Sequence, residues 1–431
     1  MPPETFDRSL WHATGGSRVA TPPLEGPIAT DVAVVGGGIL GVSTALHLAE
    51  AGTSVVLVEA REIGWGASGR NGGLVVPHYA RLGPADARAV LGADRGDRLS
   101  ALLGGGAELV FDLVRRHRIA CDPVQAGWLC PAHARSRLAG LEGRLRQWQA
   151  LGRDGLDLLD AAATAAMTGM PGYHGALLDR SGGHLNPLAY VRGLARAAMA
   201  AGARIVQDTP VTGLRRDGDR WHLDTEGGGR ISAGRVLLAT NAGRRTPAPG
   251  IAAGVVPLHV YQSATAPLPP DMRGRALPGG QSLSDTRSDL FSLRPAIGGR
   301  LVTGGMASLQ LGALGRLQQR MAQRIERFVP GLTVGGFEHQ WHGVASVTPD
   351  LLPRFWRVGP GALAVTACNG RGIALNTALG PVLAQHLSGA IGEAALPVPV
   401  TDPQPLRYPR LSAAAPGAML LFAGLHDRLA R

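Results

Sequence analysis

The sequence has no lysine. All 43 basic residues in this chain of 431 residues are arginines, and because only 32 residues are acidic, the formal net charge is +11. Aromatic residues are also scarce, at 4% of the chain. Nucleic-acid surfaces typically cluster basic residues among aromatic ones, whereas these arginines are scattered. The composition therefore does not indicate a nucleic-acid partner, and it predicts solvated faces that attract acidic molecules.

Cysteine is nearly absent too. The three cysteines are Cys121, Cys130 and Cys368, and no two of them form a Cys-x-x-Cys pair. An odd number of dispersed cysteines is typical of a reducing compartment, so we expect a cytoplasmic protein without structural disulfides. We expect no metal site.

Long apolar runs are missing as well. No stretch reaches the roughly 20 apolar residues that a membrane-spanning helix needs. The N-terminus lacks the basic and apolar regions of a signal peptide. The apolar segment 413–425 is too short to span a membrane, and Pro416 and Gly417 interrupt it. We expect this segment to dock on the body of the protein or on a partner.

Residues 31–73 carry the strongest pattern in the chain. Residues 31–35 form a short apolar run that predicts a strand buried on both faces of a parallel sheet. The spacing then predicts a helix over 39–51 and a second strand over 54–58. Strand, helix and strand in this order form the βαβ unit of a dinucleotide-binding domain.

Three glycines and one acid give this unit its chemistry. Gly36, Gly38 and Gly41 have the Gly-x-Gly-x-x-Gly spacing. The first permits a tight turn, the second lets a pyrophosphate approach bare backbone, and the third packs helix against strand. Glu59 ends the second strand, where its carboxylate can accept hydrogen bonds from both hydroxyls of an adenosine ribose. A glycine-rich turn with a purely structural role is the alternative.

A second glycine-rich segment follows at 64–73. Such a loop lets backbone come into contact with a flat ligand, while Ser68 and Asn71 supply oriented polar groups. A flexible linker is the alternative interpretation.

The rest of the chain predicts cap helices, further strands and a second sheet. Helices are expected between 85 and 167 and over 185–201. Strands are expected at 204–207, 221–224, 230–232 and 235–243. From 254 to 343 the alternation predicts a mostly antiparallel sheet that carries the substrate pocket, with one helix near 317–328.

The last core segment, 362–387, predicts strand, glycine turn and helix once more. The N-terminus of this helix would direct positive potential toward a ligand, and a plain strand-to-helix turn is the alternative. No second Gly-x-Gly-x-x-Gly motif with a downstream acid appears. A separate nicotinamide domain is therefore not expected, and electrons would come from the substrate.

These residues together resemble the glycine/D-amino-acid oxidase superfamily of FAD enzymes, and within it the gamma-glutamylputrescine oxidase-like branch. The resemblance runs from SLWHAT (9–14) to GIALNT (372–377), and it is most specific in DVAVVGGG (31–38) and LVEAREIGWGASGRNGG (57–73). Supporting motifs are LATNAG (238–243), LRPAIGGRLVTGG (293–305), VTPDLLP (347–353) and NGRGIAL (369–375).

The resemblance implies an α/β fold, α+β overall, in which a Rossmann-like FAD-binding domain is joined to a mostly antiparallel substrate domain with cap helices. The FAD-binding domain would comprise 27–90, 185–250 and 344–400. The substrate and cap domain would comprise 91–184 and 251–343, between an N-terminal arm (1–26) and a C-terminal tail (401–431).

It also implies which residues bind FAD. Those at the pyrophosphate would be Gly36, Gly38, Leu40 and Gly41. Those at the adenosine would be Glu59, Arg61 and Val211. Those along the pyrophosphate, ribityl chain and flavin would be Ala67, Ser68, Asn71, Gly72 and Gly73, with Asn241 in a polar turn beside the cofactor. Those at the pyrimidine edge of the flavin would be Gly370, Arg371, Gly372 and Ile373.

Departures from the family pattern are informative. Relatives that attach FAD covalently use a cysteine just before the segment that matches VTPD, where this chain has residues 343–346, GVAS; noncovalent FAD is therefore expected. Sarcosine oxidases hold the substrate carboxylate partly with a lysine at the position where this chain has Ile373 and Ala374. They also activate oxygen beside a second lysine, and this chain has no lysine at all. Without lysine, an arginine or a protonated histidine must favour oxygen reduction; otherwise the enzyme is a dehydrogenase.

Two residues are candidates for substrate chemistry. Arg294 stands where amino-acid oxidases clamp a substrate carboxylate, and a bidentate guanidinium suits that task. The usual tyrosine before it is missing, so a structural ion pair is the alternative. His342 would lie with Trp341 in front of the flavin, with a structural histidine as the alternative. His78 and Tyr261 are further wall candidates, and no obligatory base is required.

The sequence thus predicts an FAD-dependent amine or amino-acid oxidoreductase. It would move a hydride from the carbon beside a primary or secondary amine to the flavin, giving an imine and then an aldehyde or keto acid. Oxygen is the expected acceptor. The alternatives are a flavin dehydrogenase or flavin-binding subunit that passes electrons to a partner, and a basic surface that recruits tRNA.

Overall fold

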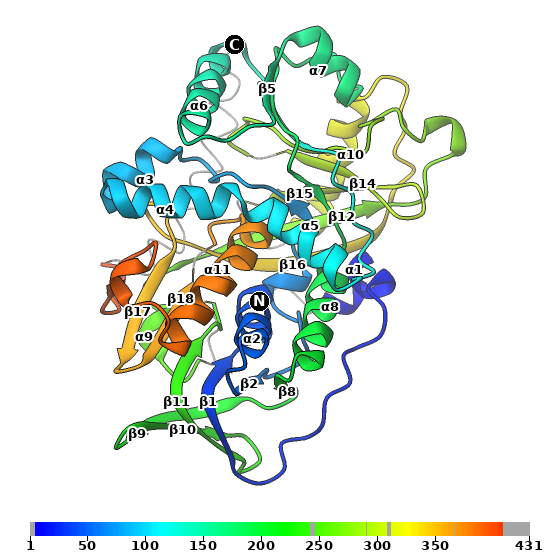
Figure 1. Cartoon of the computed structure of the whole chain (residues 1–431). Helices are drawn as coiled ribbons and strands as arrows, with labels where there is room; N and C mark the ends of the chain where they lie inside the picture. The colour runs from blue at the N-terminus through cyan, green and yellow to red at the C-terminus, as the bar shows by residue number, and fades with distance from the viewer. Residues whose placement is uncertain (1–4, 242–245, 290, 308–311, 367, 408–431) are drawn as a thin grey trace.

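Two β-sheets organise the molecule. The computed structural model describes residues 5–241, 246–289, 291–307, 312–366 and 368–407. One sheet of nine strands contains the βαβ unit, and a second sheet of eight strands lies beyond it (Figure 1). The predicted apolar segment 413–425 and the last residues of the predicted strand 235–243 lie outside the described residues.

The first sheet has a parallel centre. Its parallel strands, in spatial order, are β18 (Ala362–Thr366), β11 (Arg230–Leu238), β1 (Ile28–Val35), β2 (Val55–Val58) and β8 (Arg204–Val206). An edge is added by β17 (Arg354–Gly359), which is antiparallel to β18, and by β19 (Val400–Thr401). The hairpin of β9 (Val211–Asp217) and β10 (Arg220–Thr225) pairs antiparallel with β11.

Apolar strand residues bury both faces of this sheet. Val32 and Val34 belong to the core that contains α2 (Ile39–Glu50), α8 (Pro187–Ala200) and α11 (Gly372–Ser388). Ala33 and Val35 belong to a second core on the other face, with Trp221 and Trp356. This arrangement explains why β1 reads as a continuous apolar run.

The chain changes direction at β1. From β1 it builds outward through β2 and β8 on one side, and later through β11 and β18 on the other. In open parallel sheets, ligands bind beyond the carboxyl ends of the strands at such a switch point. Gly36 follows β1 and Glu59 follows β2, so both stand at this edge.

The second sheet is antiparallel except for one pair. Its order is β16 (Phe337–Val347), β12 (Val256–Thr265), β15 (Arg300–Met306), β14 (Ser292–Ala296), β13 (Ser282–Ser284), β4 (Trp128–Pro131), β6 (Ala176–Asp179) and β5 (Leu156–Leu159). Only β13 and β4 run parallel. The prediction of a mostly antiparallel sheet is confirmed.

Helices surround this sheet. Helix α10 (Ala313–Phe328) packs on β12 and β15. The cap helices are α3 (Pro84–Leu91), α4 (Ala93–Gly104), α5 (Gly106–Arg116), α6 (Leu138–Ala150) and α7 (Ala161–Thr168). Two further helices are short, α1 (Leu10–Thr14) and α9 (Pro249–Ala252), and the strands β3 (Leu74–Val75) and β7 (Gly183–His184) form a separate pair. The 3-10 turns are η1 (Phe6–Arg8), η2 (Ala67–Gly69), η3 (Arg135–Arg137), η4 (Pro270–Met272) and η5 (Glu393–Ala395).

Two local predictions differ from the structure. The stretch expected to be helical between 85 and 167 also contains strands β4 and β5, because both pair with β6 from a later part of the chain. Two separate strands were expected at 230–232 and 235–243, but β11 is continuous because it pairs with β1 from Ile231 to Leu238. Long-range pairing overrides local pattern in both places.

Within the described ranges, no helix combines the length and the apolarity needed to cross a bilayer.

Gly41 tests the packing of α2 on β1. A Cβ at Gly41 would lie 2.0 Å from the carbonyl oxygen of Gly36. We expect Gly41→Ala to lower the free energy of unfolding by about 1–3 kcal/mol, the usual penalty for overpacking. Thermal and chemical denaturation measure the change.

Gly140→Ala is the matched control. Gly140 also lies inside a helix, but nothing stands within 4 Å of the added methyl group. Alanine is favoured over glycine in a helix by roughly 0.5–1 kcal/mol, so this variant should be unchanged or more stable. Equal destabilisation of both variants would contradict the packing argument.

Candidate active site

The glycine turn after β1 has the geometry that its spacing predicts. Gly36 has φ +114°, and a Cβ there would lie 2.7 Å from the carbonyl oxygen of Ala239. Gly38 is the N-cap of α2 and has no side chain to cover the helix end. Leu40 is buried in the first turn, so only its backbone is available to a ligand. The turn leaves backbone and a helix N-terminus open to a phosphate.

Glu59 lies beside this turn. Its Oε2 accepts a hydrogen bond from the Gly37 amide at 2.6 Å, and its Oε1 accepts one from the Arg61 amide at 2.9 Å. Burial raises the pKa of Glu59, while these amides act in the opposite direction. The Thr209 amide donates to the Glu59 carbonyl at 3.0 Å, which brings the start of β9, with Val211, to the same place. The glycine turn, Glu59 and the start of β9 therefore lie together at one corner.

The loop 64–73 is ordered by its own side chains. Ser68 Oγ accepts from the Ile39 amide at 2.9 Å and so joins the loop to the first turn of α2. Asn71 Nδ2 donates to the Ser68 carbonyl at 2.8 Å, and Asn71 Oδ1 accepts from the Gly73 amide at 2.9 Å. Ala67 and Ser68 begin the short turn η2. These bonds do not fit a flexible linker.

Three consecutive carbonyl groups of this loop are held from the other side. Trp341 Nε1 donates to the Arg70 carbonyl at 2.8 Å, and Trp11 Nε1 donates to the Asn71 carbonyl at 2.7 Å. Arg294 Nε donates to the Gly72 carbonyl at 2.8 Å. The donors come from β16, α1 and β14, three distant parts of the chain. Sequence reasoning missed Trp11, because nothing in its local sequence links it to the loop.

Arg294 uses its other donors within the protein. Its guanidinium also donates to the carbonyls of Leu185 at 3.0 Å and Pro295 at 2.9 Å, and to His184 Nδ1 at 3.0 Å. Its Cζ lies 4.5 Å from the centre of the Trp11 ring. The geometry therefore supports a structural role and not the expected carboxylate clamp. The partners are carbonyl groups and an imidazole, not the carboxylate of the expected ion pair.

Burial lowers the pKa values of both Arg294 and His184. Burial lowers the pKa of Arg294 to about 9. Burial and the neighbouring guanidinium lower the pKa of His184 to about 3. His184 is therefore neutral at pH 7, with Nε2 donating to the Gly280 carbonyl at 3.0 Å and Nδ1 accepting from Arg294.

His342 faces away from the loop, contrary to expectation. Side chains alternate along a strand, and Trp341 already points to the loop, so His342 points to the opposite face. There His342 Nε2 lies 2.8 Å from His259 Nδ1, and the His342 ring lies 4.9 Å from Tyr261. Tyr261 packs in a cluster with α10. The structure thus places His342 and the wall candidate Tyr261 on the face away from the loop, opposite Trp341.

His78 is also an internal group. It is fully buried, and its Nε2 lies 2.8 Å from Asp179 Oδ2, which Arg153 contacts at 2.8 Å as well. Burial lowers the pKa of His78 to about 4. For Asp179, burial acts to raise the pKa, but the hydrogen bond from His78 and the charge of Arg153 have the larger combined effect and lower it to about 2. This buried trio fixes the cap next to Trp148.

The remaining predicted cofactor residues follow β11 and β18. Asn241 has φ +54°, and its Oδ1 accepts from Thr366 Oγ1 at 2.9 Å. Gly370 has φ +81°, Arg371 is the N-cap of α11, and Ile373 is buried in its first turn. Gly372 packs close to Cys368. Because β11 and β18 lie beside β1, these residues stand at the same carboxyl edge as Gly36 and Glu59.

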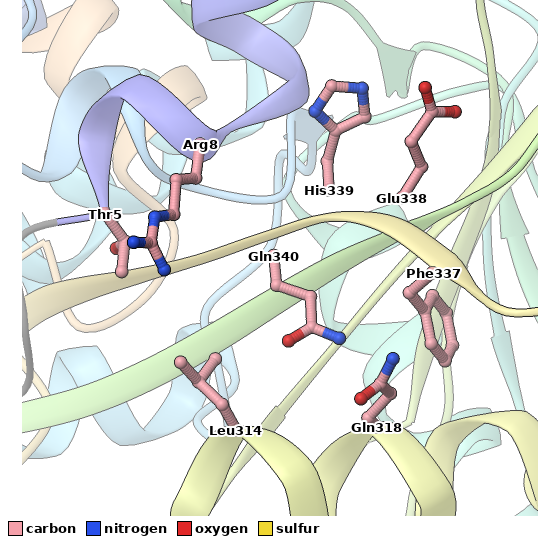
Figure 2. A pocket seen from close by; sticks show the side chains of 8 residues that line it. All are labelled: Thr5, Arg8, Leu314, Gln318, Phe337, Glu338, His339 and Gln340. Carbon is pink, nitrogen blue, oxygen red and sulfur yellow. The ribbon is translucent and has the colours of Figure 1, made fainter.

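A separate cavity of about 470 Å³ lies elsewhere (Figure 2). It is lined by residues of η1, α10 and β16 and by none of the predicted cofactor residues. Figure 2 also shows the alternation in β16, since Gln340 points toward α10 and His339 points away. Gln340 lies on the same face of the strand as His342, in agreement with the position of His342.

Comparison with known proteins decides the family. The model of the FAD dependent oxidoreductase family (DAO) matches residues 31–386. The chain belongs to this family. It is 30% identical over 388 residues to the gamma-glutamylputrescine oxidoreductase of Escherichia coli (strain K12), covering 89% of this chain and 90% of that protein. It is 29% identical to the probable oxidoreductase OrdL of Rhizobium meliloti (strain 1021), covering 88% of each.

Solved structures agree with the fold of this FAD-dependent oxidoreductase. L-proline dehydrogenase from P. horikoshii superposes with a TM-score of 0.71 at 18% identity, covering 86% of this chain and 96% of that one. Glycine oxidase from Geobacillus kaustophilus superposes with a TM-score of 0.68 at 22% identity, covering 86% and 98%. The predicted superfamily, the mixed α/β fold and FAD as the cofactor are confirmed, and the corner around Gly36, Glu59 and Ser68 has the donors and acceptors that FAD needs.

The neutral state of His184 and His78 predicts an acid-sensitive fold. The unfolded histidines titrate near 6.5, and the folded pKa values lie at about 3 and about 4. Unfolding therefore takes up protons below about pH 6.5, so their stabilising contribution is present above that pH and is lost as the pH falls toward 3. We expect the free energy of unfolding to fall by up to about 1.4 kcal/mol per pH unit for each histidine.

His184→Gln is the variant to compare. A glutamine can accept from Arg294 and donate to Gly280 without titrating. Urea denaturation between pH 7 and pH 5 should show a smaller loss of stability in this variant than in the parent. Identical pH dependence in both would mean that His184 does not titrate as described.

Proposed function

We propose that this enzyme oxidises a primary or secondary amine, or an amino acid, with noncovalently bound FAD. The observation that carries the proposal is the continuous edge formed by the Gly36 turn, Glu59 and the braced loop 64–73. Backbone amides and the Ser68 hydroxyl at this edge would hold the pyrophosphate, and Glu59 the adenosine ribose. Bound FAD supplies a ring system that accepts a hydride from the substrate.

The sequence of β16 supports noncovalent attachment. Gly343 lies two residues from Trp341 and therefore on the same face, toward the loop. A Cβ at Gly343 would stand 3.1 Å from Arg70 Cβ. No thiol is present at the position where covalent relatives carry a cysteine. We expect acid precipitation to release the flavin into solution.

The substrate would be an amine in its neutral form. The gamma-glutamylputrescine oxidoreductase of Escherichia coli is named for an amine of this kind, and such a substrate fits here. A hydride leaves the carbon beside nitrogen, and the nitrogen lone pair stabilises the resulting imine, which water then hydrolyses. Because His342 lies on the far face of β16, we assign it no proton transfer, and alignment of the carbon with the flavin is the main catalytic factor.

Oxygen is the proposed acceptor of the electrons, in a cytoplasmic enzyme. With no lysine in the chain, the buried guanidinium of Arg294 supplies a cation beside the loop, since its Nε donates to the Gly72 carbonyl. A positive charge near reduced flavin favours the formation of superoxide. A dehydrogenase or an electron-transferring subunit remains the alternative, and a dye acceptor distinguishes it from an oxidase.

Anaerobic mixing tests the reaction. The purified protein is titrated with putrescine derivatives, sarcosine, glycine and D-amino acids while the flavin absorbance is recorded. We expect at least one amine to bleach the flavin band, and admission of oxygen to restore it. If no amine bleaches the band, the proposed substrate class is wrong; if bleaching occurs but only a dye restores the colour, the enzyme is a dehydrogenase.

A further inference from the structure

The described part of the N-terminal arm, residues 5–26, runs past α8 to the start of β1 (Figure 1). Two arginines of α8 hold its middle. Arg192 donates to the Gly16 carbonyl at 2.7 Å. Arg196 donates to the Ser17 carbonyl at 2.6 Å. The backbone of the arm is therefore fixed to the helix by charged side chains, whose hydrogen bonds are the stronger kind.

The arm also contacts two parts of the predicted FAD site. Trp11 Nε1 donates to the Asn71 carbonyl in the glycine-rich loop at 2.7 Å. Farther along the arm, Arg18 donates to the Arg61 carbonyl at 3.3 Å. The Arg61 amide in turn donates to Glu59 at 2.9 Å. The arm thus connects the loop to the corner that contains Glu59.

Trp11 stands in contact with the other two donors of the loop. It is 2% exposed, and its ring lies edge-on to the ring of Trp341 with the centres 5.4 Å apart. Arg294 Cζ lies 4.5 Å from the centre of the Trp11 ring. The three donors form one cluster, so the three successive carbonyl groups that they bind all point toward it.

The amide groups between these carbonyls point the other way. The N–H and the C=O of a trans peptide have opposite directions, and the described residues contain no cis peptide. Because the carbonyls on their N-terminal side are held in the cluster, the amides of Asn71 and Gly72 are directed away from it. Neither amide donates to any group among the described residues. Successive N–H groups on one side of a turn form a binding site for a ligand oxygen.

We propose that Trp11 is a positioning residue for the cofactor and that docking of the arm is coupled to FAD binding. The indole holds the Asn71 carbonyl and thereby directs the Gly72 amide toward FAD. A donor that is already oriented loses less entropy when the ligand binds, so a docked arm increases the affinity for FAD. Linkage requires that FAD holds the arm in place by the same factor. The proposal rests on the function proposed above, because it needs FAD at this edge.

Trp11→Phe tests the indole donor, because phenylalanine keeps an aromatic ring and loses the N–H. We expect the dissociation constant of FAD to rise about 3- to 10-fold, the usual effect of one hydrogen bond. Flavin fluorescence on dilution of the holoenzyme measures it. At saturating FAD the visible spectrum of the bound flavin should also shift, because the Gly72 amide is no longer held in one direction. A loss of stability alone would leave that spectrum unchanged.

Trp221→Phe is the matched control. Trp221 is 6% exposed, and its Nε1 also donates to a backbone carbonyl, that of Pro360, at 3.0 Å. It lies in β10, in the core on the other face of the first sheet. Thermal denaturation should show a similar loss of stability in both variants, while Trp221→Phe keeps the FAD affinity and the flavin spectrum of the parent. Equal weakening of FAD binding in the two variants would overturn the proposal.

Trypsin measures the coupling in the parent protein. The bond after Arg18 lies in the arm, and 47% of the Arg18 side chain is exposed. Mass spectrometry follows cleavage at this bond in the full chain, freed of FAD and with FAD added back. FAD should slow the cleavage in the parent and in Trp221→Phe, and much less in Trp11→Phe. Equal rates in the parent with and without FAD would contradict the coupling, and this comparison needs no variant that must fold.

Failure of the two proposals looks different. If the parent binds FAD and amines reduce it, but Trp11→Phe has the affinity and the spectrum of the parent, the role of Trp11 is wrong and the amine oxidoreductase stands. If no amine reduces the flavin while FAD still protects the arm, the substrate class is wrong and the positioning role stands. If the parent binds no FAD, both proposals are wrong.

Discussion

Three hydrogen bonds to consecutive carbonyl groups hold the site together. The carbonyls of Arg70, Asn71 and Gly72 each accept from a buried side chain, Trp341, Trp11 or Arg294. A glycine-rich segment has a large conformational entropy to lose, and only fixed partners keep it in one conformation. These donors join the second sheet and the N-terminal arm to a loop of the first sheet's βαβ unit, so the arm is part of the packing around this loop.

The need to hold this loop in place explains why the charged side chain of Arg294 is buried. Arg294 is 2% exposed and has no carboxylate partner among the residues that the structure describes, an arrangement that costs free energy unless hydrogen bonds offset it. Carbonyl groups of three residues, the neutral ring of His184 and the face of Trp11 provide that compensation. His184 must stay unprotonated for this purpose, which links the pH dependence of folding to the geometry of the loop.

The alternation of side chains in β12 and β16 separates residues that are neighbours in the sequence. His342 and Tyr261 are one residue away from Trp341 and Gln262, and this single step moves them to opposite faces of the sheet. The face toward the loop carries Gln262, Ser292 and Ser284, and the other face packs against α10. A one-residue difference therefore decides which residues face the loop.

The sequence by itself determined the βαβ unit. Gly36, Gly38, Gly41 and Glu59 lie within one local βαβ segment, and local spacing is sufficient because each residue acts through its own backbone turn or strand end. The fold class and the second sheet could also be predicted, since strand alternation is a local pattern. Only the tertiary structure decided the positions and contacts of Trp11, Arg294, Gln262 and His342. Their positions depend on strand register and on contacts between segments more than 60 residues apart, such as Trp11 with Trp341, and no local pattern encodes either.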